Sequence, residues 1–289
     1  MVRGTRGFTL PELLAVIAVI ALVAAITFPV MRAARHSALR GACVSNFNQA
    51  TVATQLYLND YDDTFMLTNY RVVRNSADEI DRTWVQLLLP YLKSFDVFRC
   101  PADSRSYEKT RAVFDVDLFP GDTYDRYYRA SLLSNIGYNY LYLSPIMQLG
   151  ANWLVVPKTM SQIADPSSMI LFVDTVNIHQ KSNEMPGGGS YIVAPPCRFS
   201  SGPNGSMDSF GIASGAILYS PTRGWLINGE NRTERYGRAW AWHMERTVSV
   251  RVAGSIRSHR LEDLAAGCDV RDKWGGLIKD SGHYTWDNN

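Results

Sequence analysis

The chain has 289 residues, of which 46% are hydrophobic and 19% are charged, and its formal net charge at pH 7 is +2. A nearly neutral chain without a block of basic residues is not expected to bind nucleic acid. The length is sufficient for one sizeable hydrophobic core, and the four cysteines are compatible with disulfides in an exported domain.

The first thirty residues carry the most informative pattern. A basic leader with Arg3 and Arg6 ends at Gly7, and Glu12 is the only charge in the apolar run Phe8–Val30. A helix over this run would be about 34 Å long, which is enough to span the hydrocarbon core of a membrane. A cleavable secretory signal is the alternative, but its apolar region is usually about 7–15 residues long and Glu12 fits it poorly. We therefore expect the span to stay with the protein.

The residues around the end of the leader resemble a known processing signal. Residues 7–14 read Gly-Phe-Thr-Leu-Pro-Glu-Leu-Leu. This is similar to the G-F-T-L-x-E-L-L pattern of class III signals, which open type IV prepilins and type II secretion pseudopilins, and the resemblance covers about residues 4–30. It implies that a prepilin peptidase cuts between Gly7 and Phe8 and methylates the new amino group of Phe8. It also implies that residues 1–7 are a cytoplasmic leader and that the chain beyond residue 30 lies outside the cytoplasm.

Glu12 has two interpretations. Thr9 and Glu12 have the spacing of a capping box, in which the Glu12 carboxylate accepts a hydrogen bond from the Thr9 N–H. Alternatively, Glu12 of one subunit in a filament pairs with the Phe8 amine of a neighbour, which offsets the cost of burying either charge alone. We favour the assembly role, and the two roles can act at different stages.

The helix is expected to continue far beyond the membrane span. Pro29 removes the helical hydrogen bond to the Ala25 carbonyl and should kink the helix, and related pilins carry a proline at this place. After Pro29 the apolar residues recur at spacings of three and four, as in an amphipathic helix. These residues are Leu39, Cys43, Phe47, Ala50, Ala53 and Tyr57. We therefore predict one helix from about Leu10 to about Tyr61, with residues 8–30 as transmembrane and assembly segment and residues 31–61 as its amphipathic half.

Residues 62–289 are expected to form one extracytoplasmic head domain. Short apolar runs predict strands, and the run 248–252 alternates as a half-buried antiparallel strand should. The strand candidates are Met169–Val173, Ile192–Ala194, Ala216–Tyr219 and Val248–Val252. Trp84–Pro90 is predicted to be a short helix closed by proline, and residues 103–125 and 179–209 have the composition of loops. The predicted fold class is α+β, with the long N-terminal helix packed on an antiparallel sheet in a pilin-like head.

A second resemblance covers landmarks of the head. They are Cys43, Asn46, Gln49, Tyr57, Tyr61, Trp84, Leu87, Pro90, Tyr91, Arg99, Cys100, Pro101, Tyr138, Asn139, Tyr140 and Asp174. This series is similar to the large prepilin-like proteins of planctomycetes and their relatives, which often end with an H-x9-D-G motif. Here His243 is followed at the matching spacing by Ala253-Gly254, so the aspartate is absent, and Ser255 replaces a common second histidine.

The four cysteines allow three disulfide pairings, and the sequence alone does not select one. Cys197 and Cys268 lie in late, loop-rich regions. We favour a Cys43–Cys100 disulfide because both residues belong to the landmarks of the second resemblance. Free buried thiols are the alternative.

The sequence does not predict an enzyme, a cofactor or a metal site. His243-x-Glu245 lacks the H-E-x-x-H spacing of a zinc protease, and the Gly187–Ser190 run lacks the lysine of a phosphate loop. Asp60, Asp62 and Asp63 offer oxygen ligands for calcium, but they lack the spacing of a twelve-residue calcium loop. We expect these three aspartates to form a polar helix end.

The leading hypothesis is a structural subunit of a type IV pilus or a type II secretion pseudopilus. The chain would be a single-pass protein of the inner membrane with its head in the periplasm or outside the cell, and the large head suggests a minor or tip subunit. The implied partners are the prepilin peptidase, other pilin or pseudopilin subunits, the inner-membrane assembly platform and membrane lipid. The alternative is a monomeric, membrane-tethered binding domain, and an anchored hydrolase is a third possibility. Tryptophans that could line a binding surface are Trp225, Trp240, Trp242, Trp274 and Trp286.

Overall fold

The fold is taken from a computed structural model of the chain. It describes residues 9–75, 78–103, 128–149, 152–176, 188–196, 199–200, 217–220, 224–227, 230–233, 235–271 and 275–287. Gly7, Phe8, Cys197 and Trp274 lie outside the described residues, as do most of the two predicted loop regions.

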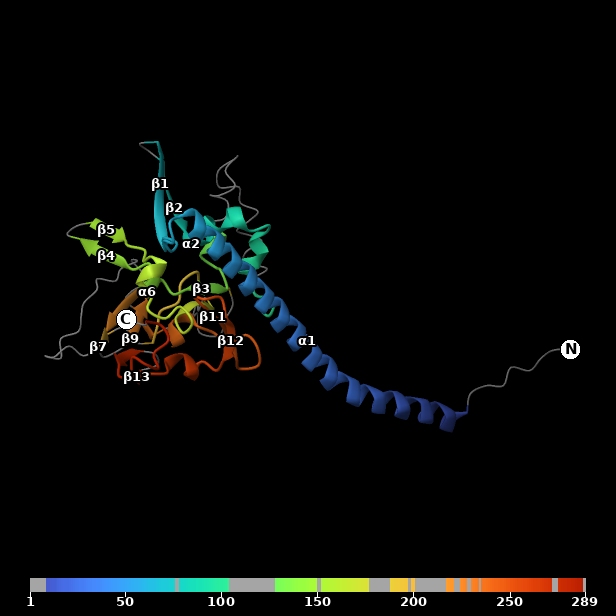
Figure 1. The fold of residues 1–289 in the computed structure, drawn as a ribbon. Helices are drawn as coiled ribbons and strands as arrows, with labels where there is room; N and C mark the ends of the chain where they lie inside the picture. The colour runs from blue at the N-terminus through green and yellow to red at the C-terminus, as the bar shows by residue number, and fades with distance from the viewer. Residues whose placement is uncertain are drawn as a thin grey trace.

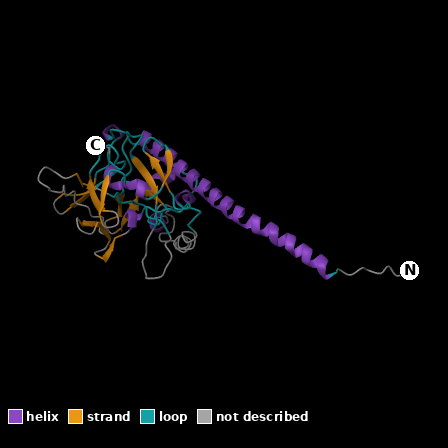
Figure 2. Cartoon of the chain, turned by 90° about the horizontal axis from the view of Figure 1, so that it is seen from below, coloured by secondary structure: helices purple, strands orange, loops and turns teal. Residues whose placement is uncertain are grey.

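The dominant element is helix α1, Leu10–Asp60, which runs for 51 residues. It begins after Thr9, whose backbone is extended, and a proline in its first turn removes an N–H that has no helical partner there. Figures 1 and 2 show the N-terminal half of α1 projecting from the head, while the C-terminal half lies along it. The helix ends one residue before the predicted end, because Asp62 and Asp63 adopt the left-handed conformation. The predicted long helix is therefore confirmed.

Pro29 does not break α1, which is continuous through this residue. Figure 1 shows the axis changing direction within the N-terminal half of the helix. Proline removes one backbone hydrogen bond from a helix and pushes the preceding turn outward, so a bend of this kind is its expected effect.

The head is built on a four-stranded antiparallel sheet with the order β12-β11-β6-β3. The strands are β3 (Ile136–Tyr138), β6 (Ile170–Asp174), β11 (Thr247–Arg251) and β12 (Ile256–His259). Helix α1 packs against β11 and β12, and also against three short helical segments between residues 84 and 98. This arrangement confirms the predicted α+β class, with a long helix on an antiparallel sheet.

Strand β11 differs from its prediction. All five of its residues are buried, whereas the alternating pattern predicted one solvent-exposed face. The reason is its inner position: β11 pairs with β6 on one side and with β12 on the other, and both faces of the sheet are covered. Ser249 and Arg251 are therefore buried polar residues rather than surface ones.

The hydrophobic core lies between α1 and this sheet. Trp84 is fully buried at its centre, stacks on Phe172 with 5.0 Å between ring centroids, and donates from Nε1 to the Tyr191 carbonyl at 2.6 Å. Trp84 opens helix α2 (Trp84–Leu88), which continues as the 3-10 turn η1 (Leu89–Tyr91). The predicted helix at this place is confirmed. Trp84, Val85 and Leu88 are buried in the core, and Leu87 and Leu89 are partly buried against it.

The described residues form four smaller sheets besides the four-stranded one. They contain β1 (Asn69–Asn75) with β2 (Asp78–Thr83), β4 (Ile146–Leu149) with β5 (Asn152–Val155), β8 (Ile217–Ser220) with β9 (Gly224–Ile227) and β10 (Glu230–Thr233), and β13 (Cys268–Arg271) with β14 (Gly275–Ile278) and β7 (Phe199–Ser200). Pairs within them are antiparallel except β14 with β7. The remaining short helices and turns are η2 (Phe95–Phe98), α5 (Tyr128–Ser131), α6 (Tyr140–Leu143), η3 (Met160–Gln162), η4 (Arg235–Arg238) and η5 (Glu262–Ala265).

One predicted strand is wrong. Residues 192–194 do not form a strand, because Ile192 makes only an isolated parallel bridge with Tyr138. Pro195 and Pro196 follow immediately, and proline has no N–H with which to extend a ladder of hydrogen bonds.

Candidate functional site

The exposed half of α1 is the first candidate site. Large apolar side chains between Leu10 and Met31 are 48–73% exposed, and the most apolar 18-residue window of the helix has a mean hydropathy of 2.8 and no buried residue. A soluble monomer rarely exposes an apolar surface of this extent, so this surface needs lipid or other protein to cover it. Among the described helices, α1 alone is long and apolar enough to cross a membrane, a property it shares with signal sequences.

Glu12 lies in the first turn of this exposed half. Its carboxylate Oε2 accepts a hydrogen bond from the Thr9 N–H at 2.8 Å and another from the Thr9 hydroxyl at 2.7 Å. The carboxylate thus satisfies an N–H that has no helical partner, as the capping interpretation predicts. Pairing with the Phe8 amine of a neighbouring subunit involves a second chain and stays a prediction, and Gly7 and Phe8 lie outside the described residues.

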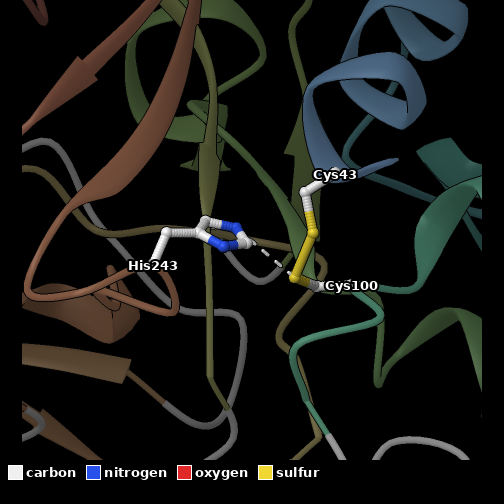
Figure 3. Close-up of side chains that lie close together, drawn as sticks. All are labelled: Cys43, Cys100 and His243. Atoms are coloured by element: carbon white, nitrogen blue, oxygen red, sulfur yellow. Dashed lines mark hydrogen bonds between the residues drawn. A yellow bond between two sulfur atoms is a disulfide. The ribbon is translucent and has the colours of Figure 1, made fainter. Parts of the chain in front are cut away.

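The junction between α1 and the head is the second candidate site. The structure joins Cys43 of α1 to Cys100 in a disulfide with 5.4 Å between the two Cα atoms, which is the pairing favoured from the landmark residues (Figure 3). Close by, Asn46 of α1 donates from Nδ2 to the Arg99 carbonyl at 2.8 Å. The N–H of Cys100 donates to the side-chain oxygen of Asn135 at 2.9 Å. Cys268 is disulfide-bonded as well, and no cysteine among the described residues is free.

A buried histidine and a buried aspartate lie against this disulfide. Nε2 of His243 is 3.6 Å from Sγ of Cys100 (Figure 3). It is 3.7 Å from Oδ2 of Asp174. Asp174 at the end of β6 is fully buried and His243 before β11 is 3% exposed. Oδ2 of Asp174 also accepts a hydrogen bond from the Val248 N–H at 2.8 Å, while its Oδ1 is buried without a hydrogen-bond partner.

Burial is the main cause of the pKa shifts of His243 and Asp174. It raises the pKa of the Asp174 carboxyl well above its ordinary value, against the smaller lowering effect of the Val248 N–H. Burial also lowers the pKa of His243 to about 4, with a further contribution from the positive charges of Arg40 and His36. Burial thus disfavours the charged form of each group, although their distance would allow an ion pair.

In the sequence His243 belongs to a C-terminal motif that lacks its aspartate, and Asp174 belongs to the landmarks of the head, and no pattern relates the two. In the structure His243 is packed, and its approach to Cys100 and Asp174 depends on how β6, β11 and α1 meet in the fold. The ligand atoms of Cys43, Cys100 and His243 all lie within 4.8 Å of one another, and this is the one such group of three among the described residues.

The other sequence candidates are not brought together. The Tyr91 hydroxyl donates to Oδ2 of Asp60 at 2.7 Å, which raises the pKa of Tyr91 to about 12, and Asp62 and Asp63 are exposed in the turn that ends α1. Within the described part of the chain these three aspartates do not form a ligand group for calcium. Asp60 is the last residue of α1, and Asp62 and Asp63 follow it in the turn.

The tryptophans are not gathered into a described binding surface. Trp286 is fully buried and donates from Nε1 to the Leu264 carbonyl at 2.7 Å. Trp240 and Trp242 are half-buried, and Trp242 donates to the Thr175 carbonyl at 2.9 Å. The side chains of Trp225 and Trp274 lie outside the described part of the structure.

Comparison with known proteins identifies one segment. Residues 2–28 match the model of the prokaryotic N-terminal methylation motif, and no curated protein and no solved structure matches the chain. The motif ends inside the exposed half of α1. Together with this long apolar helix, it fits a prepilin-like protein with a class III signal.

Proposed function

We propose that this protein is a membrane-anchored structural subunit of the pilin or pseudopilin type, which is cut after Gly7, methylated on Phe8 and assembled through α1. The main support for the proposal is that the methylation motif and the exposed apolar helix are continuous in the chain. A methylation motif at residues 2–28 leads directly into a helix whose apolar half is exposed. We call this exposed apolar half of α1 the arm. A soluble domain does not need an exposed apolar arm, whereas a subunit that moves from the membrane into a filament needs it in both environments.

The exposed arm supplies the energy for both states. Burying one large apolar side chain contributes about 1.5–3 kcal/mol, and thirteen such side chains lie exposed between Leu10 and Met31. Lipid covers them in the membrane, and the arms of neighbouring subunits cover them in a filament. The transfer between the two environments therefore needs little change in buried apolar area.

Glu12 supplies the specific contact in this proposal. Cleavage after Gly7 creates a positively charged amine on Phe8, close to the start of α1. In the single chain the Glu12 carboxylate is held by Thr9. In a filament it exchanges that contact for the amine of a neighbouring subunit, because an unpaired charge inside an apolar bundle is costly.

The finer assignment follows from the size of the head. More than 220 residues follow α1, and a bulky head hinders dense helical packing, so we assign the chain to the minor or tip subunits of a type IV pilus or a type II secretion pseudopilus. Its partners in this role are the prepilin peptidase, other subunits, the inner-membrane assembly platform and membrane lipid, with the head in the periplasm or outside the cell. The role requires no enzymatic activity and no cofactor.

Processing is tested by producing the full chain in bacterial membranes with and without an active prepilin peptidase. With the peptidase, N-terminal sequencing and intact mass should give a chain that starts at a methylated Phe8 and retains the apolar span. Gly7→Val should block the cut, because a branched side chain obstructs the peptide bond, whereas Gly4→Val in the same leader is the matched control and should not. A mature chain that starts near Ile26 would show an ordinary signal peptide and contradict the proposal.

Assembly is tested separately with an antibody to the head. The processed protein should appear in the sheared surface fraction and crosslink to other subunits through positions in the first half of α1. Processed chains that stay single in the membrane under conditions in which filaments form would favour the alternative, a tethered monomeric binding domain.

A further inference from the structure

The disulfide, His243 and Asp174 form a cluster that the proposed structural role does not explain. The four residues come from four separate segments: α1, the loop after η2, the end of β6 and the turn before β11. Both side chains are buried there, and Oδ1 of Asp174 has no hydrogen-bond partner. Burying a polar atom without a hydrogen bond destabilises a fold, so the arrangement calls for another state that uses these groups.

Two distances from Nε2 of His243 are close to those between neighbouring ligands of a zinc ion. With zinc–sulfur bonds of about 2.3 Å and zinc–nitrogen bonds of about 2.0–2.1 Å, a tetrahedral site places sulfur and nitrogen roughly 3.6 Å apart. Nε2 of His243 lies 3.6 Å from Sγ of Cys100 in the structure. Oxygen and nitrogen ligands of such a site would be roughly 3.3 Å apart, and Oδ2 of Asp174 lies 3.7 Å from Nε2 of His243.

We propose that, when the Cys43–Cys100 disulfide is reduced, the two sulfurs, Nε2 of His243 and a carboxylate oxygen of Asp174 bind one Zn²⁺. The two sulfurs must move apart to make room for the ion, which rotation of the two cysteine side chains allows. The carboxylate of Asp174 must move toward them, since the ligand atoms that already lie within 4.8 Å of one another are those of Cys43, Cys100 and His243. No water ligand is needed, because four protein groups complete a closed tetrahedral site of the structural type.

The chemistry balances with a dithiol as reductant. Two thiol–disulfide exchange steps transfer two electrons, so the reductant becomes a disulfide and Cys43 and Cys100 become thiols. Zn²⁺ then replaces the two thiol protons, Asp174 binds as a carboxylate and neutral His243 binds through the free electron pair of Nε2. Two exchange steps with a disulfide oxidant reverse the change: the oxidant takes up two electrons and becomes a dithiol, the Cys43–Cys100 bond forms again and the ion is released.

The consequence is that α1 can be fixed to the head in two ways. Under oxidising conditions a covalent bond joins Cys43 to Cys100, and under reducing conditions a metal ion joins Cys43 to three segments of the head. A freshly exported chain that has not yet been oxidised would thus be able to hold its helix in place.

The test uses the full chain in detergent, with Cys197→Ser and Cys268→Ser so that Cys43 and Cys100 are the remaining thiols. A phosphine reduces the disulfide under anaerobic conditions, and Co²⁺ then serves as the spectroscopic probe. The reduced protein should bind one Co²⁺ with thiolate charge-transfer bands and the visible bands of tetrahedral coordination, and one equivalent of Zn²⁺ should displace it. The oxidised protein should show none of these bands.

Variants distinguish the proposed site from free thiols. His243→Ala and Asp174→Asn should each weaken Co²⁺ binding by at least tenfold and alter the visible spectrum. His283→Ala, at an exposed histidine outside the cluster, is the matched control and should change neither. Circular dichroism of each reduced sample, with and without metal, shows whether binding accompanies folding. The proposal is overturned if the reduced protein binds no Co²⁺, whether or not it is folded, or if binding is the same without His243 and Asp174.

Discussion

Removing the Cys43–Cys100 crosslink should lower the free energy of unfolding by roughly 4 kcal/mol. The two residues are 57 positions apart, and closing a loop of that length restricts the unfolded chain by about 14 cal/mol/K in the chain-entropy description, which is about 4 kcal/mol at 25 °C. The native contacts around the bond remain after reduction, since Asn46 still reaches the Arg99 carbonyl and Phe47 stays in the core. The loss should therefore come mainly from the greater freedom of the unfolded state.

The measurement is urea unfolding of the full chain in detergent, followed by tryptophan fluorescence, with the disulfide intact or reduced. Trp84 and Trp286 are fully buried and report loss of the core. A chelator keeps the reduced sample free of metal, so that the proposed Zn²⁺ site contributes nothing. The Cys197→Ser and Cys268→Ser background isolates the one bond.

A loss close to the whole stability of the head is a realistic outcome, because small domains are stable by only about 5–15 kcal/mol. The reasoning is refuted if reduction changes the free energy of unfolding by less than about 1 kcal/mol. Such a result would mean that the unfolded chain already keeps these two segments together, or that native contacts strengthen when the bond is absent.

Three further predictions concern other parts of the molecule. The Glu12→Ala variant should insert into the membrane normally, since its span is more apolar, but little of it should reach the sheared filament fraction. The Glu12→Gln variant tests whether the charge of Glu12 is needed for assembly. A normal filament yield from both variants would leave Glu12 with the capping role alone. A chain that begins near Arg35 should be soluble, monomeric and cooperative in urea unfolding, because it loses the exposed arm and keeps the packed stripe; aggregation on gel filtration would argue against an independent head. His243 and His259 each have a pKa lowered to about 4 by burial, so the unfolded state binds their protons first and stability should fall as the pH drops from about 6.5 to about 4. In that series His243→Gln should flatten the decline and His283→Gln should leave it unchanged, and equal slopes for all three proteins would contradict the assignment.

The sequence predicts the long elements of this fold well, because each is encoded by a repeated local pattern. Helix α1 carries a continuous apolar run followed by a stripe at helical spacing, and its ends are set by Thr9 at one side and by Asp62 and Asp63 at the other. The strands β6 and β11 lie within one residue of their predicted bounds for the same reason.

Features that depend on tertiary contacts were less predictable. The alternation in β11 indicates a strand but says nothing about what covers its second face, so the burial of Arg251 came only from the structure. The cluster at the disulfide is the clearest case. His243 and Cys100 are 143 positions apart in the sequence. They are in contact because the turn before β11 faces the loop that follows η2 beside α1. No local spacing of residues in the sequence predicts this contact.

The position of the disulfide along α1 has a mechanical consequence. Cys43 is the first fully buried residue of the helix, so the crosslink lies where the free arm meets the packed half. A pull on the arm, as during extraction from a membrane, would otherwise peel the helix from the sheet one turn at a time, beginning at this point. With the bond in place the load passes from Cys43 into Cys100 and the backbone beside it, and the packed half of the helix carries almost no peeling force. The disulfide thus protects the noncovalent contacts between the packed half of α1 and the head from a force applied to the exposed half.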